Sequence, residues 1–147
     1  MGVDYTESNI LDNTFGQARD NAAFRVTLAG NELERNIVDD EWLGFSDDRD
    51  FRQITVEADG SYSFDIEGNT VPLTATLWQE IYGQLMVVAR GELDNVAMHY
   101  GETYYLEIGN ADASANLNTN YDVLVTSAAA SIALNNDEYR NNMQVLA

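Results

Sequence analysis

The sequence predicts an all-β protein, an antiparallel β-sandwich of jelly-roll or similar type with about seven to nine strands. Short segments of alternating apolar residues recur along the chain and are separated by Gly, Asn and Asp. No segment has the apolar periodicity of a long helix. The chain has 147 residues, 45% of them hydrophobic and 10% aromatic, which is enough for one hydrophobic core.

The N-terminal part is expected to contain little regular structure before the first strand. Residues 1–22 are polar, lack helical periodicity and are interpreted as an acidic arm or linker. The first strand is expected over residues 23–28, where apolar side chains alternate. Residues 31–40 are charged and are expected to form a loop or a short helical turn. The β-sandwich domain is therefore predicted over residues 23–134.

The clearest strands lie in the middle of the chain. Residues 51–58 and 61–66 flank Asp59-Gly60, a dipeptide that favours a tight hairpin turn. The next strand is expected over residues 71–78, which alternate and are rich in β-formers. Four later strands are expected at residues 85–89, 96–100, 103–108 and 121–126.

The charge balance excludes several classes of partner and site. The chain carries 25 acidic residues against seven basic ones, all Arg, for a formal charge of −18. Nucleic acid and anionic membrane surfaces repel such a chain. The lack of Cys excludes disulfides, a thiol nucleophile and thiolate zinc sites. No apolar run approaches the ~20 residues that membrane insertion of a helix requires.

Acidity of this degree has three interpretations that the composition leaves open. The acids can keep the protein soluble, adapt its surface to high salt, or bind hard cations such as calcium. Acids and Asn gather near residues 7–13, 39–50 and 135–142, and this clustering favours ion-bound junctions. The absence of Lys fits a salt-adapted surface.

Three segments resemble the bacterial pre-peptidase C-terminal (PPC) domain family, in particular the PPC-like modules of large secreted adhesins and surface proteins. Residues 9–18 are similar to its acidic opening, and residues 42–64 to its Gly-Phe, Asp-x-x-Asp-aromatic, strand, turn, strand signature. Residues 100–108 and 120–125 are similar to its paired closing strands. The resemblance implies a β-sandwich outside the cell or on its surface, with a role in binding or attachment rather than catalysis.

The resemblance also implies a calcium site. Carried over by position, its ligands are Glu7, Asn9, Asp12 and Asn13, facing Asp47 and Asp50. Calcium takes six to eight oxygen ligands at ~2.3–2.6 Å, and loops rich in Asp, Glu and Asn supply them. Asp47 and Asp50 are three residues apart in an expected turn before a strand, so both can reach one ion. The alternative is a solvated acidic turn without metal.

The C-terminal part is harder to interpret. Residues 110–120 are expected as a polar loop, and residues 127–134 are ambiguous between helix and strand. Residues 135–147 are interpreted as a linker or an inter-subunit segment, with a disordered polar tail as the alternative. A second ion-binding junction is predicted at Asn136, Asp137 and Glu138. The apolar residues 143–147 can add to the sheet edge of a neighbour.

Other chemistry depends on single residues. His99 is the sole histidine and no nucleophile-elbow motif surrounds any Ser, so a structural role for His99 is favoured over catalysis. Trp42 and Trp78 can form an exposed carbohydrate platform, with core packing as the alternative. Trp78 and Tyr104 are the candidate binding residues. Tyr104 and Tyr105 point to opposite faces of their strand, so one ring is expected in the core and the other partly exposed.

The leading functional hypothesis is a non-enzymatic, extracellular structural or adhesion module with calcium as its cofactor. It would act as a repeat or subunit of a surface adhesin, surface layer or filament, with neighbouring copies or modules, extracellular matrix or polysaccharide as partners. One alternative is a substrate-targeting module of a secreted hydrolase that binds collagen or polysaccharide. Another is a virion- or pilus-like subunit that polymerises through its ends.

Overall fold

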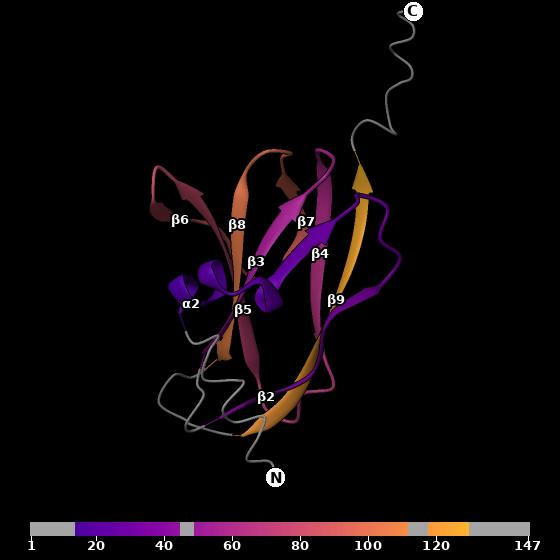
Figure 1. Cartoon of the computed structure of the whole chain (residues 1–147). Coiled ribbons are helices and arrows are strands. Elements are labelled where there is room, and N and C mark those ends of the chain that lie inside the picture. The colour runs from indigo at the N-terminus through magenta and orange to yellow at the C-terminus, as the bar shows by residue number, and fades with distance from the viewer. Residues whose placement is uncertain (1–13, 45–48, 112–117, 130–147) are drawn as a thin grey trace, which may run out of the picture.

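The computed structural model describes residues 14–44, 49–111 and 118–129, which form two packed β-sheets (Figure 1). These residues contain nine strands and two short helices, and this confirms the predicted all-β sandwich. The elements are α2 (Phe15–Asp20), η1 (Ala22–Phe24), β1 (Arg25–Leu28), β2 (Arg35–Leu43), β3 (Arg49–Val56), β4 (Gly60–Glu67), β5 (Leu73–Ile81), β6 (Gln84–Gly91), β7 (Leu93–Met98), β8 (Thr103–Asn110) and β9 (Thr119–Ala129). Within the described ranges, no helix is both long and apolar enough to cross a lipid bilayer.

The chain passes repeatedly from one sheet to the other. The five-stranded sheet has the order β1-β3-β8-β5-β6, and the four-stranded sheet has the order β2-β9-β4-β7. Neighbouring strands are antiparallel except β1 and β3, which are parallel. Among the described strands, β5 and β6 alone are consecutive in the chain and also paired. Most pairings therefore join strands that are distant in the sequence.

The predicted hairpin at Asp59-Gly60 is wrong, because the two strands it connects belong to different sheets. β3 pairs with β1 and β8, whereas β4 pairs with β7 and β9. The Tyr100 amide donates a hydrogen bond to the carboxylate of Asp59 (2.8 Å), which ties this connection to the β7–β8 connection. A turn motif such as Asp-Gly predicts that the chain reverses direction, but it does not predict that the two flanking strands pair with each other.

The hairpin that does form connects β5 and β6 through Tyr82 and Gly83. Both residues have positive φ angles, 52° and 80°, as the central residues of a type I′ turn do. Glycine adopts this conformation without strain, whereas tyrosine does so rarely. The dipeptide is therefore a weak turn signal in the sequence.

Two N-terminal segments are more regular than predicted. Residues 15–20 form α2, where the Gln17 amide donates to the Thr14 hydroxyl and the Thr14 amide donates to the Gln17 side chain. This helix has only 6 residues, which is too short to show the apolar periodicity of a helix in the sequence. The capping box stabilises its first turn. Residues 35–43 form β2 in place of the expected loop. Asp40 has a positive φ of 53°, and two register shifts against β9 interrupt the alternation of this strand.

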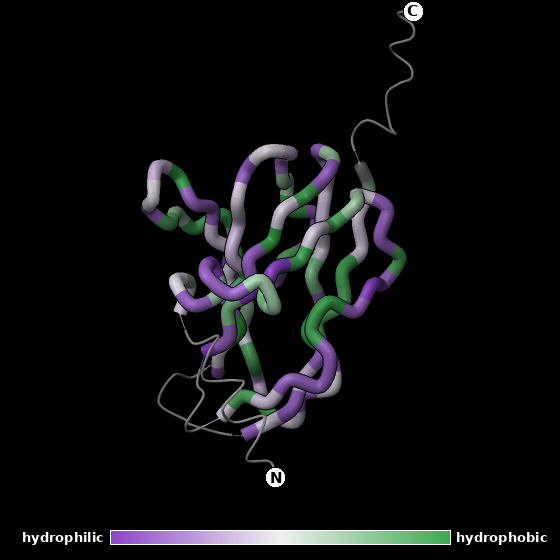
Figure 2. Tube along the Cα trace, viewed as in Figure 1, coloured by the Kyte–Doolittle hydropathy of each residue, from purple (hydrophilic) through white to green (hydrophobic). Residues whose placement is uncertain are grey.

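Apolar side chains of both sheets fill the space between them, and Figure 2 shows the hydrophobic stretches that these strands contribute. The largest fully buried side chains in this core are Tyr62, Tyr104, Tyr121, Leu28, Leu43, Ile54, Leu77, Leu93, Met98, Leu106 and Ile108. A second, smaller cluster lies on the outer face of the five-stranded sheet, beneath α2 and η1. Its buried members are Ala18, Phe24, Phe51 and Tyr105.

Candidate functional site

Most of the predicted calcium ligands lie outside the described residues. These are Glu7, Asn9, Asp12, Asn13 and Asp47, together with the predicted second junction of Asn136, Asp137 and Glu138. Asp50 is described, and it lies within strand β3 rather than in a turn before it, which corrects its predicted position. In the part of the chain that the structure describes, no group of three or more His, Cys, Asp or Glu is arranged to hold a metal ion.

Asp50 makes a buried hydrogen bond between the two sheets. Its side chain is 1% exposed, and the Tyr121 hydroxyl on β9 donates to its Oδ2 at 2.6 Å. Burial, together with the nearby Asp50 carboxylate, raises the pKa of the Tyr121 phenol well above its ordinary value of 10.0. The phenol therefore keeps its proton and stays a donor. This geometry suits an inter-sheet tie, and it does not fit an exposed loop ligand for calcium.

Two further polar ties lie near the same edge of the sandwich. Arg52 on β3 donates to the Glu41 carboxylate on β2 at 3.2 Å, so this ion pair also joins the two sheets. Its guanidinium lies 4.8 Å from the centre of the Phe24 ring. The third tie is Glu32, whose carboxylate accepts the Ser127 hydroxyl of β9 at 2.6 Å. The region around β1 is thus held to the four-stranded sheet by hydrogen bonds and ion pairs.

The Glu32 carboxylate is satisfied although it is buried. The amides of Ala29 and Gly30 donate to it at 2.7 and 3.1 Å, in addition to Ser127. Burial acts to raise the pKa of this carboxyl, but the hydrogen bonds from Ser127, Ala29 and Gly30 outweigh it and hold the pKa below the ordinary 4.5. The ionised form of Glu32 is therefore the one that the folded state stabilises.

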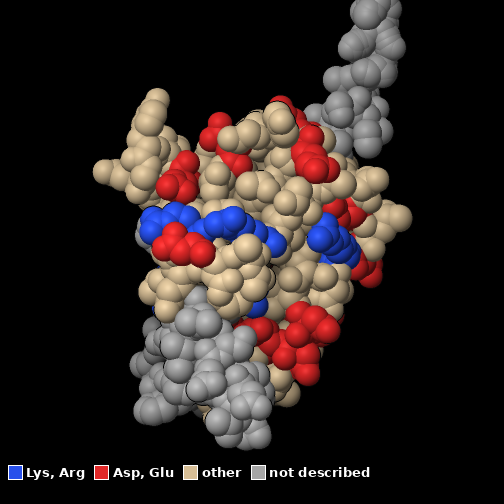
Figure 3. Space-filling model, in the orientation of Figure 1, with Lys and Arg blue, Asp and Glu red and all other residues tan. Residues whose placement is uncertain are grey.

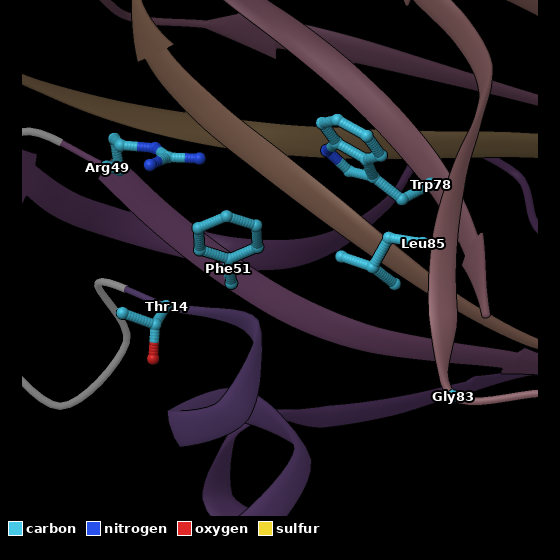
Figure 4. Close-up of a pocket in the computed structure, with 6 residues that line it drawn as sticks. All are labelled: Thr14, Arg49, Phe51, Trp78, Gly83 and Leu85. Carbon is cyan, nitrogen blue, oxygen red and sulfur yellow. The ribbon is translucent and has the colours of Figure 1, made fainter.

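A cleft of about 390 Å³ opens on the outer face of the five-stranded sheet, near the β5–β6 hairpin (Figure 4). Its lining residues are Thr14, Arg49, Phe51, Trp78, Gly83 and Leu85. In Figure 4 the side chains of Phe51, Trp78 and Leu85 face the same space, and Arg49 extends across its rim. The volume lies within the ~300–1,000 Å³ of small-molecule sites. The binding role predicted for Trp78 stays a prediction, with this cleft as its setting.

The Glu107 carboxylate on β8 accepts hydrogen bonds from two residues that line this cleft, Trp78 and Arg49. The Trp78 indole N–H donates to its Oε1 at 2.9 Å, and Nε of Arg49 donates to its Oε2 at 2.7 Å. The Arg49 guanidinium lies 5.1 Å from the centre of the Phe51 ring. The cleft therefore combines fixed aromatic faces with a fixed cation. This combination suits a ligand that has an apolar face and polar groups along its rim.

Tyr104 does not belong to any surface platform. Its ring is 1% exposed in the core between the sheets, and its hydroxyl accepts the His99 amide at 2.8 Å. Tyr105 points to the opposite face and is also fully buried, beneath α2. The expectation that one of these two rings is partly exposed is wrong. The reason is that the outer face of this sheet is itself covered, by the helical segment and by Trp78.

The β5–β6 hairpin is the main exposed apolar feature of the described residues. Its exposed apolar side chains are Ile81, Tyr82, Met86, Val87 and Val88, and Tyr82 is fully exposed at the turn. Residues 81–89 contain no charged side chain in a chain of net charge −18. Figure 3 shows a projecting tip without acidic or basic atoms at the place where Figure 1 draws this hairpin. In the sequence, this uncharged run indicates only one more apolar strand.

β6 is also the least protected of the four sheet edges. At β1, which has four residues, Arg35 donates to the Thr27 carbonyl at 2.8 Å. β2 and β7 each contain a residue with positive φ, Asp40 and Asn95, and each has register shifts. Charge, irregularity and short length are the usual means of blocking an edge. β6 has eight residues and one register shift, and its exposed side chains are mainly apolar.

Comparisons with known proteins add no assignment. No family model matches this sequence, and no curated protein matches it. The resemblance to the PPC family therefore stays a prediction.

Proposed function

We propose that this protein is a non-enzymatic structural or adhesion module of an extracellular assembly, which joins its neighbours through the open edge of strand β6. It acts as a repeat or subunit of a surface adhesin, surface layer or filament. The observation that carries this proposal is the edge strand at the end of the five-stranded sheet, whose residues 84–89 are uncharged and mostly apolar.

An open strand edge presents a row of unpaired backbone N–H and C=O groups. An exposed, apolar edge strand readily pairs with another strand, and a protein that has no use for such pairing blocks it. Three edges of this sandwich carry short length, register shifts with a positive-φ residue, or a capping side chain. β6 has one register shift, but its exposed side chains are mainly apolar. Two strongly acidic molecules repel each other, so an uncharged contact surface is the favourable place for them to meet. β6 therefore supports a role in assembly.

The test compares one added charge at two edges. Val87→Asp places a charge on β6, and Ala97→Asp places the same charge on the exposed side of β7, so both variants carry the same net charge. The full-length protein is expected to associate in sedimentation velocity as its concentration rises. Val87→Asp is expected to abolish this association and Ala97→Asp to preserve it. A monomeric wild type, or equal behaviour of the two variants, would contradict the proposal.

Calcium binding stays a prediction within this proposal. The described residue of the predicted set, Asp50, is engaged with Tyr121, so calcium would depend on the acids of residues 7–13 and on Asp47. Binding is expected to release heat in calorimetry and to raise the melting temperature, and a chelator should reverse the shift. Magnesium provides the control ion. No heat and no shift with calcium would remove the metal from the proposal.

A second candidate function is favoured by the outer-face cleft. A module that targets a hydrolase to polysaccharide or collagen needs an accessible aromatic ring next to fixed polar groups, and Trp78 with Arg49 supplies both. Trp78→Ala is expected to remove binding to an immobilised polysaccharide or collagen. Tyr100→Ala, which truncates an exposed ring outside the cleft, should leave binding unchanged. Absence of wild-type binding across both polymers would exclude this function.

A further inference from the structure

We infer that strand β6 of one copy pairs antiparallel with β6 of a second copy, forming a twofold-symmetric dimer whose five-stranded sheets become continuous. The inference rests on the proposed function, because it names the neighbour that occupies the open edge. A twofold interface uses the same surface patch on both copies.

The pairing of β6 with β5 fixes the face of each β6 side chain except that of Val88, which lies at the register shift. Leu85, Val87 and Arg90 lie opposite the outer-face residues of β5. Met86 and Ala89 lie opposite inner-face residues of β5. Alternation is interrupted between Val87 and Ala89, where the register shifts and β6 contains an extra residue. The apolar side chains are thus distributed over both faces of the edge strand.

One antiparallel register matches these faces between two copies. Because of the extra residue, the sequence of faces is symmetric about the bond between Val87 and Val88. In this register Met86 lies opposite Ala89 of the second copy, on the inner face. Leu85 lies opposite Arg90 of the second copy, on the outer face. Directly opposed side chains on one face are the contacts that stabilise a strand pair, and each of these pairs occurs twice.

The same register also brings opposite charges together. Glu80 on β5 lies opposite Leu85 on the outer face. Arg90 of the second copy lies on the other side of Leu85 and on the same face. Neighbouring strands are ~4.8 Å apart, so the backbones of Glu80 and of Arg90 in the second copy are about 10 Å apart across the sheet. Extended Arg and Glu side chains bridge this distance. Two such pairs flank an uncharged centre, and this complementarity favours a second copy as the occupant.

The first experiment reverses the two charges separately and then mixes the variants. In Glu80→Arg each contact of the homodimer becomes Arg against Arg, and in Arg90→Glu each becomes Glu against Glu. Each variant alone is expected to weaken the dimer about tenfold. In an equal mixture, both contacts of the heterodimer are again Arg against Glu. Native mass spectrometry separates the species by mass and should show heterodimers in excess over both homodimers.

A second experiment tests the competing occupant, the apolar C-terminal residues 143–147 of a neighbouring copy. Val145→Asp adds a charge within this segment, and Asn141→Asp adds the same charge outside it. Both full-length variants are expected to dimerise as the wild type does. Circular dichroism of every variant confirms that the strand content is retained.

The outcomes separate the inference from the proposal on which it rests. Random mixing of the two charge variants, or loss of association in Val145→Asp but not in Asn141→Asp, overturns the β6–β6 pairing. If Val87→Asp still abolishes association in that case, β6 remains an assembly edge with another occupant. If Val87→Asp changes nothing, both the inference and the proposed function are wrong.

Discussion

The two ends of the five-stranded sheet differ in the kind of side chain that they carry, polar and paired at β1 but mainly apolar and exposed at β6. At the β1 end, polar groups connect the sheets: Asp50 to Tyr121, Arg52 to Glu41, and Glu32 to Ser127. At the β6 end, the exposed side chains are mainly apolar. One end closes the sandwich and stabilises the fold. The other end leaves an edge that a partner can cover.

This difference separates stability from association. At the β1 end the side chains of Leu28, Glu32 and Asp50 are buried, so their loss should lower the free energy of unfolding. Most side chains of β6 are exposed in the single chain, so their truncation should change association and leave the fold intact. Six substitutions in four experiments test this separation, in order of expected effect.

Leu28 and Val87 give the largest expected contrast. Leu28 on β1 is fully buried in the core, whereas Val87 on β6 is half exposed. Leu28→Ala is expected to lower the free energy of unfolding by about 2–5 kcal/mol, and Val87→Ala by about 0.5 kcal/mol or less. Denaturant unfolding of dilute protein measures both. Similar losses for the two variants would remove the proposed distinction between the two ends.

Tyr121 and Tyr82 allow a comparison between a buried, hydrogen-bonded hydroxyl and a fully exposed tyrosine. Tyr121→Phe removes the donor to the buried Asp50 carboxylate, while Tyr82 is fully exposed at the hairpin turn. Loss of a buried hydrogen bond to a charged group should cost about 1.5–3 kcal/mol of stability. Tyr82→Phe should leave the free energy of unfolding unchanged. The comparison is made by denaturant unfolding at neutral pH.

Glu32 should give a pH-dependent loss. Its folded pKa lies below 4.5, so its stabilisation is complete above the ordinary pKa and is lost as pH falls through the folded value. Glu32→Gln is expected to cost about 1–2 kcal/mol near pH 7. The difference between variant and wild type should shrink in unfolding measurements below about pH 4. A loss that is independent of pH would show that the charge of Glu32 plays no part.

Arg35 should give the smallest effect. Its guanidinium lies 3.6 Å from Glu32 and donates to the Thr27 carbonyl, but its side chain is half exposed. Exposed ion pairs contribute about 0–1 kcal/mol, so Arg35→Ala should cost less than 1 kcal/mol. The same substitution uncovers the β1 edge, and sedimentation velocity shows whether a second edge then begins to associate. Unchanged sedimentation would show that the short length of β1 suffices to block it.

Local pattern predicted the number of strands and most of their positions. Apolar alternation in segments such as residues 103–108 persists in any tertiary setting, so β8 forms where it was expected. Local pattern failed at β2, where register shifts break the alternation of apolar residues. It also failed at α2, because a helix of 6 residues is too short for helical periodicity to be recognised. The prediction for Asp50 placed a calcium ligand in a turn before a strand, whereas its hydrogen-bond partner Tyr121 is 71 residues away in the chain.

The sequence by itself determined the fold class, the high negative charge and the absence of thiol chemistry, because these depend on composition and on the order of neighbouring residues. The tertiary structure decided which strands pair, which edges are protected and where Trp78 lies. At Asp59-Gly60 the chain reverses, yet β3 and β4 join different sheets. In the same way, residues 81–89 are an ordinary apolar strand in the sequence. They become an open edge only because four other strands occupy the rest of their sheet and the opposite sheet leaves their side chains exposed.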